Sequence, residues 1–264
     1  MYTGWIMSLL FDYMKVHFKI KMQYKASFIC TVLAQLILVV FELFVLKSVF
    51  DKFNLLDKYN KYELYFNFSV VWVGYSLAQF IGRGFDKFSN LVRDGSFDLL
   101  LIRPRHLFLQ IIGSDMNYEK ISRILSTLIL FIYSSTKIIV DFNILKLFVL
   151  LSILLGSFMM IMSVFIIGAS VSFYTIQGIE FINIFTDGTK QLGQYPMGIF
   201  NKVVRIIFTF VIPLTLVSYY PIEYLTGRQT FIGYAFLPLL SILYIIPALL
   251  LFKLGLRKYK SSGS

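Results

Sequence analysis

Long apolar runs separated by charged segments dominate the pattern of this chain. Six of them approach the roughly 20 residues that a helix needs to cross a hydrocarbon core of about 30 Å. We predict transmembrane helices over residues 26–46, 64–81, 121–140, 147–173, 203–220 and 232–252. The pattern therefore indicates an all-α integral membrane protein whose six spans form one transmembrane domain, residues 26–260.

Residues 1–25 predict a different element, an amphipathic helix that lies on the membrane surface. Four apolar side chains are spaced to share one helical face: Trp5, Leu9, Tyr13 and Val16. Four lysines and one aspartate accompany them, a balance that favours an anionic leaflet. The alternative is an N-terminal tail with some helix. At the other end, residues 261–264 read Ser-Ser-Gly-Ser, which is typical of a tag or linker remnant, and we set them apart from the fold.

Residues 83–110, between the second and third runs, predict a bent element held against the membrane face. Apolar residues recur there at helical spacing, with charged residues mostly on the other side: Phe85, Phe88, Leu91 and Val92. Gly95 interrupts this helix. Pro104 disfavours a helical residue before it and can begin a new helix after it. Because both ends are fixed by spans, we expect this bent element to transmit movement.

The other interruptions complete the predicted topology. Residues 47–63 form a polar outer loop, residues 141–146 a short outer turn, and residues 175–202 a long polar interruption on the inner side. Small residues recur in the fourth span and allow close helix packing, as at a dimer face. Prolines bend the last two spans: Pro213, Pro238 and Pro247.

Lysines and arginines decide the orientation. Six spans place both termini on one side of the membrane. If that side is the cytosol, the inner segments hold more than twice as many basic residues as the outer ones. The positive-inside rule therefore predicts cytoplasmic termini and a cytoplasmic bent element, in the cytoplasmic membrane.

Composition supports a membrane protein and excludes several other classes. Of the 264 residues 58% are hydrophobic and 15% charged, and mean hydropathy is +0.75, unlike a soluble domain. The net charge of +11 does not indicate nucleic-acid binding, because the basic residues lie between the apolar runs. Cys30 is the single cysteine, and His17 and His106 are far apart in sequence. We therefore predict neither an intrachain disulfide nor a metal site.

The sequence lacks the motifs of an enzyme. No phosphate-binding loop occurs, and Gly188-Thr189-Lys190 has neither the spacing nor the following hydroxyl residue. We predict no enzymatic activity and no bound cofactor. Few charges fall within the spans, and we place Glu42 near an outer end and Arg123 and Arg205 also near span ends. Because ion coupling needs a titrating group at mid-depth, we expect the energy for transport to arrive from outside the bilayer.

With these features in hand, the chain resembles the six-span permease subunits of type-2 ABC exporters over nearly its whole length. The first signature lies in the bent element: Gly95, Phe97, Asp98, Leu100, Leu101, Arg103, Pro104 and Gln110. The second surrounds the fifth span: Tyr195-Pro196, Arg205, Ile212-Pro213 and Tyr220-Pro221. Each dipeptide alone is weak, whereas their order between the right spans is fairly specific.

The resemblance implies a mechanism and two partners. The bent element corresponds to a coupling helix that docks on a separate cytoplasmic ATPase, which binds ATP and Mg²⁺, and a second permease chain, identical or related, completes the transporter. It implies these coupling residues: Phe85, Phe88, Arg93, Gly95, Phe97, Asp98, Arg103 and Pro104. It also implies a re-entrant outer hairpin with Tyr220 and Pro221, a kink at Pro213, and export as the direction.

Other interpretations stay open at this point. In the first interpretation, Asp98 and Arg103 form bonds to the ATPase or fix the bend. In the second, Asp98 is only a helix cap and Arg103 only an arginine at the membrane edge. A stand-alone secondary transporter or channel is the leading alternative function, and a membrane-embedded enzyme comes third. The sequence does not indicate the cargo.

Overall fold

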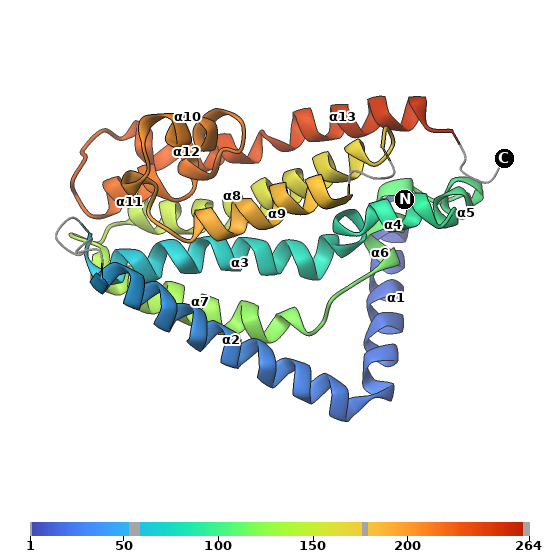
Figure 1. Ribbon diagram of the computed structural model, residues 1–264, viewed down its shortest axis with the longest axis horizontal. Coiled ribbons are helices and arrows are strands. Elements are labelled where there is room, and N and C mark those ends of the chain that lie inside the picture. Colours follow the sequence, from blue (N-terminus) through green and yellow to red (C-terminus); the bar gives the residue numbers. More distant parts are fainter. Residues whose placement is uncertain (1, 53–58, 176–178, 261–264) are drawn as a thin grey trace.

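The computed structural model describes residues 2–52, 59–175 and 179–260, which are helical with no strand (Figure 1). The helices are α1 (Tyr2–Gln23), α2 (Lys25–Lys52), α3 (Lys61–Asp86), α4 (Phe88–Arg93), α5 (Ser96–Ile102), α6 (Leu107–Ser114), α7 (Lys120–Ile138), α8 (Ile144–Val171), α9 (Ile179–Gly193), α10 (Lys202–Phe210), α11 (Tyr219–Leu225), α12 (Gly233–Ile242) and α13 (Ile245–Lys258). Two short 3-10 helices are η3 (Met197–Ile199) and η4 (Leu214–Leu216). The predicted remnant 261–264 and part of the predicted outer loop, 53–58, lie outside the described residues.

Five helical stretches in the described ranges are long and apolar enough to cross a membrane. They are α2, α3 together with α4, α7, α8, and α12 together with α13. The 28 residues of α8 rise about 42 Å at 1.5 Å per residue, which exceeds a hydrocarbon core of about 30 Å. These stretches coincide with the first, second, third, fourth and sixth predicted spans, so the chain is a multi-pass membrane protein.

The fifth predicted span, residues 203–220, is not one helix. α10 and the segment from η4 to α11 meet at a bend of 85°, with Pro213 in the break. Proline has no N–H to donate and blocks the continuing helix. Within the break the Ile212 N–H donates to the carbonyl of Ile207, and the hydroxyl of Thr215 donates to the carbonyl of Phe208 at 3.1 Å. This segment is therefore a sharply broken pair of helices.

The interruption predicted over residues 175–202 is also different from the expectation, because it contains the 15-residue helix α9. α9 packs against α3 and α8, and Figure 1 shows it running alongside both. Its described side chains include Asp187 and Lys190, and this polarity hid the helix from a search for apolar runs. Residues 176–178 of the interruption lie outside the described residues.

α3 forms the centre of the bundle, with most of its side chains buried. It packs chiefly against α7 and α8, and α8 in turn packs against α12 and α13. A Cβ at Gly74 would lie 2.8 Å from Ser157, and one at Gly156 would lie 2.6 Å from the carbonyl oxygen of Pro238. Small residues of the fourth span thus allow close packing within the chain.

α1 runs across the end of the bundle that also carries α4, α5 and α6 (Figure 1). The Tyr118 hydroxyl donates to the carbonyl of Met14 at 2.8 Å, and Lys21 pairs with Glu119 at 2.8 Å. Within the predicted apolar face, Tyr13 packs against Gly113 whereas Val16 is exposed. These contacts fix α1 to the segment before α7. That α1 lies on a membrane surface stays a prediction.

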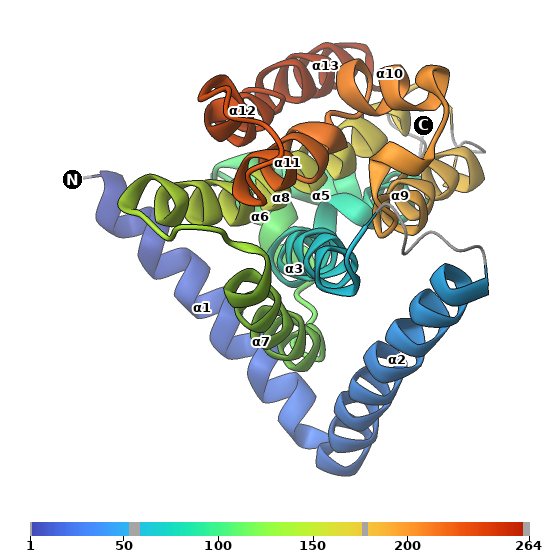
Figure 2. The same cartoon turned by 90° about the vertical axis from the view of Figure 1, so that its left-hand side faces the viewer.

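α2 stands apart from the rest of the bundle, as Figure 2 shows. It packs mainly on α7 and α1, and few of its side chains are buried. The last predicted span is divided into α12 and α13 at Leu243 and Tyr244. Pro247 accounts for this break, because it has no N–H to donate to the carbonyl of Leu243.

Candidate functional site

The bent element contains three short helices, and its two interruptions lie where the sequence predicts them. Gly95 separates α4 from α5 with a φ of 71°, a left-handed conformation that favours glycine. α5 ends at Ile102, and Arg103 is extended, as expected for a residue before proline. α6 then begins at Leu107.

Aromatic side chains attach the bent element to the bundle. Phe85, Phe88 and Phe97 are at most 1% exposed. The ring of Phe88 lies 5.1 Å from that of Phe173, which follows α8, and 5.5 Å from that of Phe252 in α13. The three predicted coupling phenylalanines therefore belong to the core. They join the bent element to the bundle, and their part in coupling to an ATPase stays a prediction.

Two polar side chains of the first signature fix the element from inside. The Tyr259 hydroxyl donates to Asp98 at 2.9 Å, joining α5 to the chain after α13. The buried amide of Gln110 donates to the carbonyls of Leu100 and Arg105 at 3.1 and 3.0 Å. These carbonyls lie at the end of α5 and in the turn that follows. Asp98 and Gln110 thus stabilise the bend.

The opposite side of the bent element is an exposed ridge, residue 99 and residues 101–106. Leu99 and Ile102 are 54% and 78% exposed. Arg103 and Pro104 are exposed as well. Arg93, the remaining predicted coupling residue, is exposed and lies 3.3 Å from Asp94. The element therefore has one face in the aromatic core and another that is free to contact a partner.

The second signature lies at the other end of the bundle (Figure 1). Pro213 breaks the chain between α10 and η4, and Pro221 lies in the first turn of α11, where a proline is tolerated. The ring of Tyr220 lies 5.1 Å from that of Tyr234 at the start of α12. The predicted hairpin over residues 220–230 is thus the second half of a larger broken element that begins with α10.

Ion pairs close this end of the bundle. We call them the outer cluster, because the positive-inside prediction places this end outside: Glu63, Glu223 and Arg228. The Arg228 guanidinium donates to both carboxylate oxygens of Glu63 at 3.0 and 2.8 Å, and lies 3.1 Å from Glu223. Burial raises the pKa of the adjacent Tyr59 to about 12, so its hydroxyl stays neutral at physiological pH. The space among these side chains measures only about 10 Å³.

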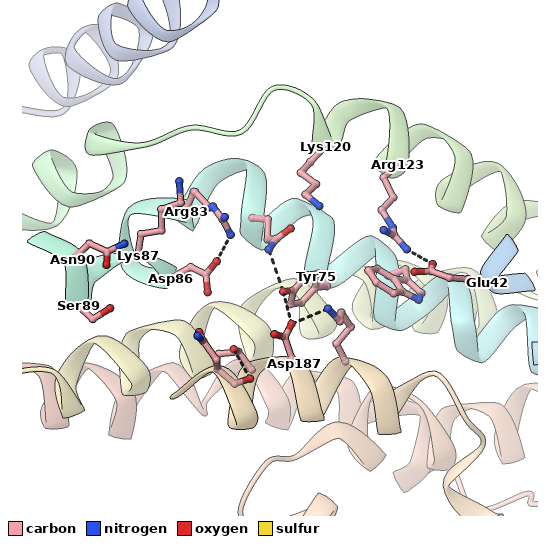
Figure 3. A pocket seen from close by; sticks show the side chains of 15 residues that line it. Glu42, Tyr75, Arg83, Asp86, Lys87, Ser89, Asn90, Lys120, Arg123 and Asp187 are labelled. Atoms are coloured by element: carbon pink, nitrogen blue, oxygen red, sulfur yellow. Dashed lines mark hydrogen bonds and ion pairs between the residues drawn. The ribbon is translucent and has the colours of Figure 1, made fainter. Parts of the chain in front are cut away.

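A polar cavity of about 440 Å³ lies between α3, α7 and α9 (Figure 3). Glu42 of α2 also lines it. The cavity reaches from Trp72 in the middle of α3 to Asn90 in α4, so it extends from the bundle interior to the bent element. Its lining contains five basic residues, Arg83, Lys87, Lys120, Arg123 and Lys190, and three acidic residues, Glu42, Asp86 and Asp187.

Most charges of the cavity are paired. Arg83 pairs with Asp86, Arg123 pairs with Glu42, and Lys190 lies 2.7 Å from Asp187. Arg123 is 4% exposed. Its guanidinium carbon lies 3.4 Å from the centre of the Trp72 ring, a cation–π contact. Figure 3 shows Lys120 and Arg123 reaching from α7 toward α3.

The cavity brings together charges that the sequence analysis placed at separate span ends. Glu42 pairs with Arg123, which lies in the first turn of α7. Sequence reasoning missed the site because its residues come from five elements, and because α9 is too polar to stand out as a span. The charged residues at the end of the second run, with Arg83 and Asp86 one turn apart, were the available signal.

Together these features define an all-helical, multi-pass membrane protein with a bent element at one end and a charged cavity in the bundle. The sequence matches the family described as ABC-2 family transporter protein over residues 36–263. The chain therefore belongs to the ABC-2 family of membrane transporters, as its two signatures predict. No curated protein and no solved structure matches the chain.

Proposed function

We propose that this chain is the permease subunit of an ABC exporter. It moves a cargo across the cytoplasmic membrane with energy from ATP hydrolysis on a separate ATPase subunit, which binds ATP and Mg²⁺. Membership of the ABC-2 family supports the transport role. This chain needs no cofactor and no catalytic residue of its own.

The two-sided character of the bent element carries the proposal. Its ridge exposes apolar side chains such as Ile102 next to Arg103, a combination that suits a protein partner. Its other face is packed into the aromatic cluster that includes Phe173, just after α8, and Phe252, within α13. A force on the ridge therefore reaches two long helices through rigid side chains.

In this proposal both termini and the bent element are cytoplasmic, and α9 makes the fifth crossing. α9 has 15 residues, about 22 Å, which is short for a span. It runs alongside α3 and α8, and the broken pair that follows lies at the far end from the bent element (Figure 1). α10 and α11 would then form the re-entrant outer element, and six crossings keep both termini on one side.

A second permease chain, identical or related, completes the transporter. The isolated position of α2 supports this, because its apolar surface packs on little else in the described part of the chain. Lipid covers the part of the apolar surface of α2 that the second chain does not contact. Two ATPase subunits bind beneath the pair, and their closure on ATP moves the bent elements.

Substitution of Ile102 by aspartate tests whether the exposed ridge of the bent element docks on the ATPase subunit. We expect the permease to fold normally, since the side chain is 78% exposed. A charge buried in the partner's groove without a counterion is costly, so recovery of the ATPase with tagged permease should fall at least tenfold, on the order of 1.4 kcal/mol. The measurement is the amount of ATPase that co-purifies from native membranes.

Ile144→Asp is the matched control. Ile144 is 86% exposed at the start of α8, and the same change there should leave ATPase recovery unaltered. Thermal unfolding in detergent checks that both variants fold. The docking role is wrong if the wild-type chain recovers no ATPase, or if the two variants behave alike.

A stand-alone, ion-coupled carrier is the second candidate, and the cavity is the observation that favours it. Its carboxylates Glu42, Asp86 and Asp187 lie within the bundle, where a proton or sodium relay would need them. Reconstitution of this chain alone separates the two functions. Transport driven by an ion gradient in the absence of any ATPase would support the carrier and contradict the exporter.

A further inference from the structure

The cavity is built mostly from hydrogen-bond donors. Its five basic residues outnumber its three acidic ones, which leaves a formal excess of two positive charges (five minus three). Lys87 pairs with Asp115 at 2.7 Å. Among the ion pairs of the described residues, none includes Lys120. Lys120 is thus a cavity cation that no carboxylate neutralises.

Buried N–H groups of the cavity also outnumber the acceptors available to them. Trp72 Nε1, Arg83 Nε and Arg123 Nε are buried and have no hydrogen-bond acceptor among the described residues. The corresponding unpaired acceptor among the lining residues is Gln79 Oε1. Buried polar groups are normally paired, so the lining as a whole is short of acceptors, although these three N–H groups are themselves closed off from the cavity.

Lys120 and Arg123 converge on one position. Lys120 Nζ and Arg123 Nη1 each lie 3.5 Å from the same atom, the amide oxygen of Gln35. These are long contacts to a neutral acceptor. Phosphate or carboxylate oxygens would accept from the same two cations at shorter distances and with a full charge. An anion that displaces the Gln35 amide would therefore be held more strongly at this position.

The surroundings of the cavity suit a ligand with an apolar part. α2, which supplies Glu42, exposes apolar side chains along its length, among them Leu36, Val40 and Phe44. Trp72 and Tyr75 add aromatic surface to the lining. A volume of about 440 Å³ accommodates a headgroup but not a long chain. An apolar chain would lie outside the cavity, in lipid next to α2.

We propose that this cavity binds the phosphate or carboxylate headgroup of an anionic amphiphile, and that such a molecule is the cargo. The headgroup lies between Lys120 and Arg123, and the apolar chain leaves the cavity on the side of α2. This inference rests on the proposed function, because it names the cargo of the permease. Its test needs no ATPase, so the headgroup inference and the proposed exporter function can fail separately.

Fluorescence of Trp72 measures the binding directly. The sequence has two tryptophans, so Trp5→Phe leaves Trp72, in the cavity, as the sole reporter. The full-length chain in a neutral maltoside detergent is titrated with lysophosphatidylglycerol. We expect a saturable change in emission, and binding at least tenfold weaker for the zwitterionic lysophosphatidylcholine, which has the same apolar chain.

Lys120→Gln is the decisive variant, and Lys137→Gln is its matched control. Both remove one positive charge from α7, but Lys137 is exposed in the last turn, away from the cavity. Hydrogen bonds to charged groups contribute about 1.5 kcal/mol or more, so Lys120→Gln should weaken lysophosphatidylglycerol binding about tenfold. Lys137→Gln should change it less than twofold. Lys120 has no ion pair to lose, so the variant should fold.

Glycerol phosphate identifies the part of the ligand that binds. If it displaces lysophosphatidylglycerol at millimolar concentration, the anionic group itself supplies most of the affinity. If it does not, while selectivity over lysophosphatidylcholine holds, the apolar chain is also required, and both results support an amphiphile headgroup site. Equal binding of the two lysolipids, or equal effects of the two lysine variants, would overturn the inference. In that case normal ATPase recovery would leave the proposed function standing.

Discussion

The outer cluster and the polar cavity both place arginine and carboxylate side chains within this membrane bundle, yet they are built in opposite ways. In the outer cluster one arginine is held by two carboxylates, around a space of about 10 Å³. In the cavity, cations outnumber carboxylates around about 440 Å³. A space of about 10 Å³ holds at most one water, so the first arrangement is closed, whereas the second has room for a ligand.

The difference teaches how charge is used at the two ends. Arg228 in the outer cluster has its donors satisfied within the chain, so its role is to hold α3, α11 and the following loop together. In the cavity, Lys120 forms no ion pair among the described residues, and Lys120 and Arg123 share the neutral amide oxygen of Gln35 at 3.5 Å. We therefore expect changes in the outer cluster to affect stability first, and changes in the cavity to affect ligand binding first.

Arg228→Ala should have the largest effect on stability. It leaves Glu63 and Glu223 facing each other, with exposed side-chain fractions of only 10% and 14%. Loss of one partner of a buried pair costs 3–5 kcal/mol, and the 34% exposure of Arg228 reduces this to about 2 kcal/mol. Thermal unfolding in detergent should show a melting temperature lower by roughly 5 °C.

Arg257→Ala is the control for that variant. Arg257 is exposed near the end of α13, and its loss should move the melting temperature by less than about 1 °C. Equal shifts for the two arginines would mean that the outer cluster does not stabilise the bundle.

Glu42→Gln should have a smaller effect on stability, about 1 kcal/mol. Glutamine keeps the size of the side chain and can still accept from Arg123, and water in the cavity can solvate the guanidinium. The same change should strengthen lysophosphatidylglycerol binding, because it removes one of the three negative charges of the lining. A loss of stability as large as that of Arg228→Ala would contradict the contrast between a closed and an open site.

The smallest expected effect is that of salt concentration on the unmodified chain. Increasing the ionic strength from about 0.05 to 0.5 M shortens the Debye length several-fold and screens accessible charges more than buried pairs. We expect lysophosphatidylglycerol affinity to fall a few-fold while the melting temperature changes little. The opposite pattern, with the melting temperature falling and the affinity constant, would reverse the assignment of the two sites.

Several parts of the fold could be predicted because they depend on local or compositional signals. Five spans follow from apolar length alone. The interruptions at Gly95 and Pro104 follow from backbone geometry, since glycine permits the positive φ and proline restricts its neighbour. The first family signature lies at these two breaks and the second surrounds the break at Pro213, which explains why the resemblance was visible from sequence.

Other parts could not be predicted, because they depend on which helices meet. The sequence places Phe85 and Phe88 on one apolar helical face, and the structure buries them, together with Phe97, against Phe173 and Phe252. The helical periodicity identifies an apolar face but not what covers it. Likewise α9 was missed because its polar residues face other polar residues, and an isolated segment cannot show that.

By itself the sequence determined that this chain is a multi-pass helical membrane protein of the ABC-2 family, with five of its spans and the breaks at Gly95 and Pro104, because apolar length and glycine or proline geometry act locally. The tertiary structure alone decided which charges neutralise each other. Glu42 and Arg123 are 81 residues apart, and Glu63 and Arg228 are 165 apart. Only the packing of helices determines whether such residues form a closed ion pair or line an open cavity.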